Sequence, residues 1–210
     1  MADHALTARA PFSGFAVPPS SASPGSSAGG VTATDCDGRG LATVALKKAQ
    51  SAALIERVRE RYGIDLPLGS SRRESRGIAF AGLGPETWLA TRDNGADDFF
   101  AALARDIGAL ASVTDQSAGY AVLRLAGPKL RDTLAKLLPL DLHPRAFKPG
   151  DVVSTLTFHM GATLWRLEDN PDGTPVFEIA VFRSLASSFW HALSESAAEF
   201  GLVVTPQNPG

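Results

Sequence analysis

The 210-residue sequence predicts an α/β protein of two lobes, each with the element order β-α-β-β-α-β. Three observations support this prediction. Short apolar runs alternate with amphipathic segments of helical period, the same order of elements occurs twice, and equivalent residues recur in both copies. A chain of this kind buries its apolar faces by packing helices against antiparallel-rich sheets.

The first 35 residues lack the pattern of a folded segment. Residues 11–30 read PFSGFAVPPSSASPGSSAGG and contain four Pro, four Gly and six Ser. Such a segment buries too little apolar area to offset the entropy lost on ordering. We therefore expect residues 1–35 to form a disordered N-terminal arm.

The first copy of the unit is expected over residues 36–118. Its first helix shows the helical period most clearly, because Leu54, Ile55, Val58 and Tyr62 recur on one face and Gly63 suits the end. Strands and helices are expected, in order, at residues 41–46 (strand), 51–63 (helix), 77–80 and 87–91 (strands), 96–108 (helix) and 110–115 (strand).

The second copy is expected over residues 119–210. Its elements are predicted at residues 120–126 (strand), 128–138 (helix), 152–158, 163–167 and 175–182 (strands), 184–200 (helix) and 202–205 (strand). Three strands lie between the two helices, so this copy is expected to carry an extra hairpin strand that the first copy lacks.

Equivalent residues indicate that the two halves arose by duplication. Val44 and Leu46 correspond to Leu123 and Leu125, Asp65-Leu66 to Asp141-Leu142, and Trp88 to Phe177. The repeated β-α-β-β-α-β order predicts two ferredoxin-like units. A half of this size buries little more than 60% of its unfolded surface, so the two lobes are expected to pack on each other.

Composition excludes several function classes. The chain has 20 Lys+Arg against 22 Asp+Glu, which argues against binding to nucleic acid. We expect no membrane segment, because no apolar stretch approaches the roughly 18 residues that a membrane helix needs. A single cysteine and the lack of a secretion signal favour a reducing compartment, so the expected location is cytoplasmic.

Few residues suggest catalysis or metal binding. The four histidines, His4, His143, His159 and His191, are too scattered to predict a metal site. Cys36 lies between Asp35 and Asp37, whose charges oppose a thiolate. The glycine-rich run at residues 82–87 and the acidic run at 168–173 both have the chemistry of turns. We therefore expect no catalytic residue and no metal ligand on this chain.

Asp141 is the one weak candidate for a cofactor-binding residue. It follows a predicted helix, at a point where its carboxylate could face a cleft. Asp65 occupies the same place in the first copy, however, and a residue repeated in both halves is more simply part of a shared turn.

Beyond these patterns, the sequence resembles the gamma subunit of heterotetrameric sarcosine oxidase. The resemblance is carried by VTDQSAGYAVLRLAGPKLRDTLAKLLPLDLHPRAFKPGD (113–151), HMGATLWRLED and PVFEIAVFRSLASSFWHALSESAAEFGL, and it extends over residues 38–205. A more distant similarity relates the chain to the folate-binding aminomethyltransferases of the glycine cleavage system. Its pattern is formed by Asp115, Ser117, Gly127, Pro128, Asp141, Pro149 and Gly150. In that family the Asp at the position of Asp141 contacts the folate amine, and Leu140 here replaces the preceding Asn.

The resemblance implies a fold like the aminomethyltransferase folate domain and a non-catalytic, structural role. The complex it implies oxidatively demethylates sarcosine to glycine and hydrogen peroxide, and yields 5,10-methylenetetrahydrofolate or formaldehyde. FAD, FMN, NAD, tetrahydrofolate and zinc are then expected on the alpha, beta and delta subunits, with none on this chain. Two alternatives remain open: a stand-alone folate-binding or one-carbon-transfer module that uses Asp141, and a regulatory module that binds a small ligand between its lobes.

Overall fold

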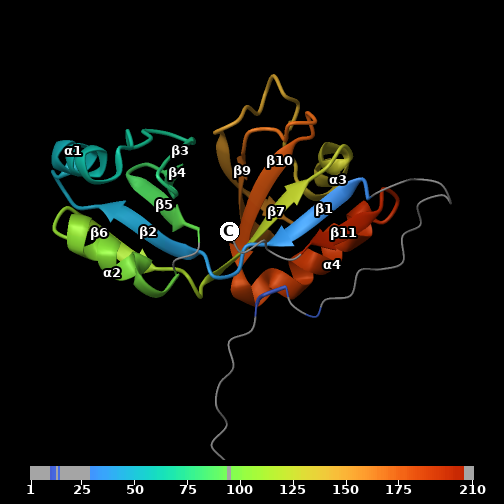
Figure 1. Ribbon diagram of the computed structural model, residues 1–210, viewed down its shortest axis with the longest axis horizontal. Helices are drawn as coiled ribbons and strands as arrows, with labels where there is room; N and C mark the ends of the chain where they lie inside the picture. The colour runs from blue at the N-terminus through green and yellow to red at the C-terminus, as the bar shows by residue number, and fades with distance from the viewer. Residues whose placement is uncertain (1–9, 13, 15–28, 94–95, 206–210) are drawn as a thin grey trace, which may run out of the picture.

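The computed structural model describes residues 10–12, 14, 29–93 and 96–205, which form two sheets side by side, each with its own pair of helices (Figure 1). The helices are α1 (Ser51–Tyr62), α2 (Ala96–Ile107), α3 (Leu130–Leu137) and α4 (Ala186–Ala197). The strands are β1 (Val31–Asp35), β2 (Gly40–Leu46), β3 (Arg72–Ser75), β4 (Ile78–Gly84), β5 (Thr87–Arg92), β6 (Ala111–Asp115), β7 (Tyr120–Ala126), β8 (Val152–Thr157), β9 (Met160–Arg166), β10 (Val176–Phe182) and β11 (Leu202–Thr205).

The first lobe contains a five-stranded antiparallel sheet with the order β3-β4-β5-β2-β6. Without β3, this is the strand order of a ferredoxin-like β-α-β-β-α-β unit, as the sequence predicts. Helices α1 and α2 cover one face, where Leu54 and Val58 meet Phe99, Leu103 and the strand side chains in one core. Gly63 ends α1 in the left-handed conformation, with φ at 68°.

The second lobe contains a six-stranded sheet with the order β11-β1-β7-β10-β9-β8. Helices α3 and α4 cover one face of this sheet and form its core with Leu134, Phe189 and Leu193. Strand β1 lies between β7 and β11, antiparallel to β7 and parallel to β11. The predicted duplication of an α/β unit is therefore confirmed, with an added strand in this copy.

Strand β1 corrects the prediction of a disordered arm at residues 31–35. Val31 and Ala33 are fully buried, because β1 fills the gap between two strands of the second lobe. The chain leading into β1 passes close to Gly127. A side chain there would clash, because a Cβ would lie 2.4 Å from the backbone oxygen of Gly30. Phe12 is also buried, with its ring centroid 6.1 Å from that of Trp190. Residues 1–9, 13 and 15–28 of the predicted arm lie outside the described residues.

Strand β3 corrects the prediction that only the second copy carries an extra strand. β3 pairs with β4 at the edge of the first sheet, as β8 pairs with β9 at the edge of the second. The sequence RRES contains no apolar residue, so the alternation that marks a half-buried strand is absent from it. Each lobe thus has three strands between its two helices.

The faces of the two sheets that the helices leave uncovered pack against each other. Leu41, Ala81 and Leu89 from the first lobe meet Val122 and Trp165 from the second in a third buried cluster. Side chains alternate between the two faces of each strand, so Trp88 packs under the helices and Leu89 packs between the lobes. Among the helices described, none is long and apolar enough to cross a membrane.

Candidate functional site

The junction between the lobes begins with a short two-stranded contact. Ser71, just before β3, pairs with Asp151, just before β8, in an isolated antiparallel bridge. Arg72 donates its backbone N–H to Gly150 O at 2.7 Å, and Val152 donates its N–H to Ser70 O at 3.0 Å. Arg72 and Val152 each open the first of the three strands between the helices of their lobe, so the two lobes contribute equivalent residues to this contact.

A cluster that we call the buried charge cluster surrounds the fully buried Glu178 at the same junction. Arg39 and Trp165 are buried with it, and the Arg124 side chain is 43% exposed. Glu178 on β10 has no exposed surface, although its strand reads VFEIAVF and is otherwise apolar. Arg39 donates to both of its carboxylate oxygens at 2.8 and 3.0 Å. Arg124 Nε donates to Glu178 Oε1 at 2.8 Å, and Trp165 Nε1 donates to Oε2 at 2.8 Å.

This cluster fixes the protonation state of its members. Burial would by itself raise the pKa of Glu178, but Arg39 and Arg124 outweigh it and lower that pKa to about 2. Burial likewise opposes the charge of Arg39, and the Glu178 carboxylate more than compensates, so the Arg39 pKa is raised. Arg39 Nε also contacts Asp93 at 2.7 Å. Because the Glu178 carboxylate already accepts four hydrogen bonds, it is a structural ion and is not available as a proton acceptor.

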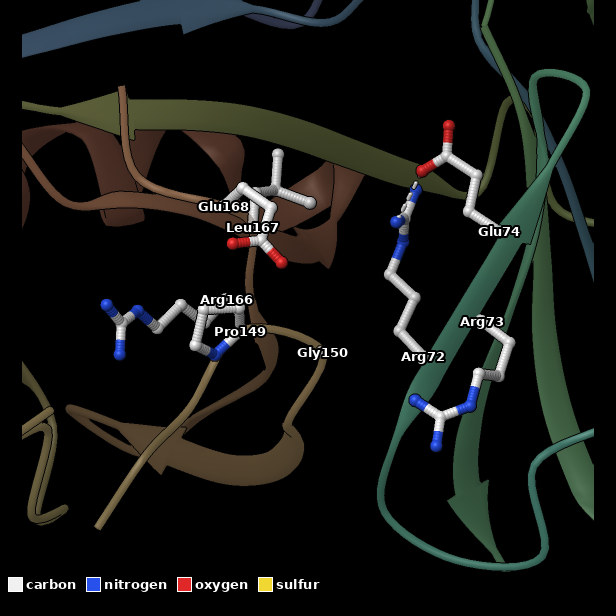
Figure 2. Close-up of a pocket in the computed structure, with 8 residues that line it drawn as sticks. All are labelled: Arg72, Arg73, Glu74, Pro149, Gly150, Arg166, Leu167 and Glu168. Carbon is white, nitrogen blue, oxygen red and sulfur yellow. Dashed lines mark hydrogen bonds and ion pairs between the residues drawn. The ribbon is translucent and has the colours of Figure 1, made fainter. Parts of the chain in front are cut away.

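The inter-lobe cleft lies beside this junction and has a volume of about 450 Å³. One wall is β3 with Arg72, Arg73 and Glu74; the other is formed by Pro149, Gly150, Arg166, Leu167 and Glu168 (Figure 2). Arg72 forms an ion pair with Glu74 at 2.6 Å. Arg166 extends away from β3 (Figure 2). Its Nη2 donates to both carboxylate oxygens of Asp169 at 2.8 and 2.9 Å. A cleft of this size is within the usual range for ligand or peptide binding.

Asp141 lies outside both the cleft lining and the buried charge cluster. Its side chain is exposed, and Oδ1 accepts the backbone N–H of His143 at 2.9 Å, which is an Asx turn. Asp65, its counterpart in the first lobe, is also exposed and accepts a hydrogen bond from Arg59 Nε at 2.8 Å. The two residues occupy equivalent places after a helix but have different hydrogen-bond partners. A role of Asp141 in folate binding stays a prediction.

The cysteine and the histidines lie in separate parts of the structure. Cys36 is buried, and burial raises the pKa of its thiol to about 11. His143 and His191 are exposed, whereas His159 lies in the β8–β9 turn with φ at 69°. His4 lies outside the described residues. The part of the chain that the structure describes contains no group of three side chains placed to hold a metal ion.

Sequence reasoning did not identify Glu178 and Arg39. They are separated by 139 positions along the chain, so no local spacing connects them. The signal was a lone carboxylate within a strand of apolar residues, which costs free energy unless a cation is buried with it.

Comparisons with known proteins agree with this architecture. The family model "Sarcosine oxidase, gamma subunit family" matches residues 47–199. Sarcosine oxidase subunit gamma from Corynebacterium sp. (strain P-1) is 38% identical over 120 residues, which are 55% of this chain and 56% of that protein. The matched segments span about half the length of the first curated relatives.

Two solved structures have the same fold. A chain of the heterotetrameric sarcosine oxidase from Corynebacterium sp. U-96, in complex with pyrrole 2-carboxylate, matches with a TM-score of 0.70 and 26% identity, covering 82% of this chain and 87% of that chain. The glycine cleavage system aminomethyltransferase T from Bartonella henselae matches with a TM-score of 0.61 and 18% identity, covering 85% and 48%. The second likeness shows the fold alone. Because the family model covers most of the sequence, the chain belongs to the gamma subunit family of sarcosine oxidase.

Proposed function

We propose that this chain is the structural, non-catalytic gamma subunit of a heterotetrameric sarcosine oxidase in the cytoplasm. The observation that carries the proposal is the family match over residues 47–199, together with the fold shared with a chain of such an oxidase. The buried charge cluster supports a structural role, since the Glu178 carboxylate is fully engaged with Arg39 before β2 and with Arg124 and Trp165 of its own sheet.

In this proposal the chemistry belongs to the alpha, beta and delta subunits. They would hold FAD, FMN, NAD, tetrahydrofolate and zinc, and would convert sarcosine to glycine and hydrogen peroxide with 5,10-methylenetetrahydrofolate or formaldehyde. The two carboxylates of this chain that were considered for a cofactor are already engaged by other groups of the chain. Glu178 already accepts hydrogen bonds from Arg39, Arg124 and Trp165, and Asp141 accepts one from its own turn.

Co-expression with the three candidate partner subunits tests the proposal. We expect this chain to purify with them in one particle that oxidises sarcosine, and we expect the purified chain alone to show neither flavin absorbance nor turnover. Omitting this chain is expected to lower the thermal stability and yield of the particle. A fully assembled, equally stable oxidase from cells that lack the chain would overturn the proposal.

A further inference from the structure

Strand β3 leaves one edge open inside the inter-lobe cleft. Gly82 donates its N–H to Ser71 O at 2.9 Å, while Arg72 donates its N–H away from β4 to Gly150 O. Antiparallel ladders alternate in this way, so residues 71, 73 and 75 bond to β4 and residues 72 and 74 face outward. In this register the backbone N–H and C=O of Glu74 point away from β4, and no described residue outside the β3–β4 ladder hydrogen-bonds to them.

The side chains around this open edge carry one unpaired charge of each sign. Arg73 projects its guanidinium from β3 toward the loop at Gly150, and Glu168 lies on the opposite wall (Figure 2). Both are exposed, and neither forms an ion pair with a described residue, whereas the neighbouring Arg72 and Arg166 are each paired. The cleft therefore offers a cation on one wall and an anion on the other.

Open strand edges bind extended chains readily, because each outward N–H and C=O can continue the ladder. In β3 the contact with Gly150 already uses the N–H of Arg72 in this way. The bridge to the second lobe ends there, and the rest of β3 runs on along the cleft. A cleft of about 450 Å³ beside an open edge is suited to a few residues of extended chain.

We propose that an extended segment of a partner subunit adds to β3 as a further strand inside this cleft, placing an acidic side chain on Arg73 and a basic side chain on Glu168. Its backbone pairs with the outward N–H and C=O of Glu74. This inference rests on the proposed function, which supplies the partner, and it identifies where on this chain that partner docks.

Two substitutions of the same residue test the strand addition. Glu74→Ala and Glu74→Pro both remove the ion pair with Arg72, but Glu74→Pro alone also removes the outward N–H. Proline is tolerated in an edge strand where the N–H faces outward. The melting temperatures of the two isolated variants are therefore expected to differ by less than about 2 °C. In co-expression with the alpha, beta and delta subunits, Glu74→Pro is expected to reduce the recovered complex at least tenfold relative to Glu74→Ala.

Hydrogen exchange gives a readout that does not depend on a variant. The Glu74 amide is expected to exchange at least tenfold more slowly in the wild-type complex than in the isolated chain, while the amide of Arg76 in the adjacent turn changes little. Arg73→Glu is expected to weaken assembly, and Arg145→Glu serves as its control because Arg145 is exposed and does not line the cleft.

The outcomes separate the inference from the proposed function. If wild-type chain does not purify with the three subunits, the proposed function fails. If it does purify with them, and Glu74→Pro assembles like Glu74→Ala with unchanged exchange at Glu74, the inference alone fails. Slow Glu74 exchange in the isolated chain that depends on its concentration would identify a second copy as the occupant and would also overturn the inference. If Glu74→Pro does not fold, the wild-type exchange measurement decides.

Discussion

In the first lobe β6 pairs directly with β2, whereas in the second lobe β1 separates β11 from β7. The two lobes share their element order and their helix-covered cores, yet only the first is built from one continuous stretch of chain. The second takes Val31 and Ala33 from a segment that precedes the first lobe, and Phe12 packs on the same core. Duplication therefore explains the repeated unit, but the second copy depends on a strand that lies outside it.

The largest effect is expected from removing residues 1–35. This truncation deletes β1, exposes the facing edges of β7 and β11, and opens the core that Val31 and Ala33 fill. We expect amides in the second lobe, such as that of Leu125, to lose hydrogen-exchange protection, while that of Phe80 in the first lobe is affected less. Equal loss in both lobes, or no loss, would show that the lobes do not differ in this way.

A smaller effect is expected from Glu178→Ala, which leaves Arg39 buried without its main partner. Removing one member of a buried ion pair typically costs about 3–5 kcal/mol, and we expect a loss of that size in urea unfolding. Asp106→Ala in the first lobe is the matched comparison. Asp106 bonds Arg61 and Tyr62 at 2.8 and 2.9 Å, but Arg61 remains exposed to water, so a much smaller loss is expected. Equal losses would contradict the distinction between buried and surface networks.

A pH effect is expected from Asp35, at the end of β1. Burial raises its pKa to about 6, while the N–H of Phe12 lowers it and the charge of Asp37 raises it. The folded chain therefore binds more protons at this group than the unfolded chain does, and the contribution to stability falls as pH rises from about 4 through 6. Asp35→Asn is expected to flatten this part of the profile of melting temperature against pH. An unchanged profile would show that another group is responsible.

The smallest effect is expected from the paired substitutions Asp65→Ala and Asp141→Ala. Both side chains are exposed and each makes one local contact, so each melting temperature should change by less than about 2 °C. Titration of tetrahydrofolate into the isolated wild-type chain and into Asp141→Ala should show no difference. Tight binding that Asp141→Ala abolishes would favour a stand-alone folate-binding module.

Most of the fold could be predicted from the sequence because most elements have a clear period. The apolar stripe of α1, with Leu54, Val58 and Tyr62 buried, follows directly from side-chain spacing. β3 could not be found in this way, because its sequence RRES has no apolar residue. Its pairing with β4 is set by the Arg76-Gly77 turn, where both residues have positive φ. β1 was obscured by the Pro- and Ser-rich run before it, and its stability comes from distant strands.

The candidate site was less predictable than the fold. The position of Asp141 after a helix made it a candidate in the sequence, but the structure brings together Arg39, Arg124 and Glu178 instead. Arg124 and Glu178 are partners on neighbouring strands of the second sheet, whereas Arg39 comes from the segment before β2, so tertiary structure alone reveals the cluster. The cleft likewise depends on β3 and on the loop at Gly150, which approach each other across the lobe junction.

The insertion of β1 has a consequence for the order in which the chain is synthesised. β1 leaves the ribosome before the other described strands, β7 about 90 residues later, and its parallel neighbour β11 after all of them. Domains tend to fold as they emerge, so the first lobe can complete its sheet during translation. The six-stranded sheet has to wait until β11 has emerged, and until then β1 is a nascent strand whose β11-facing backbone groups have no strand partner.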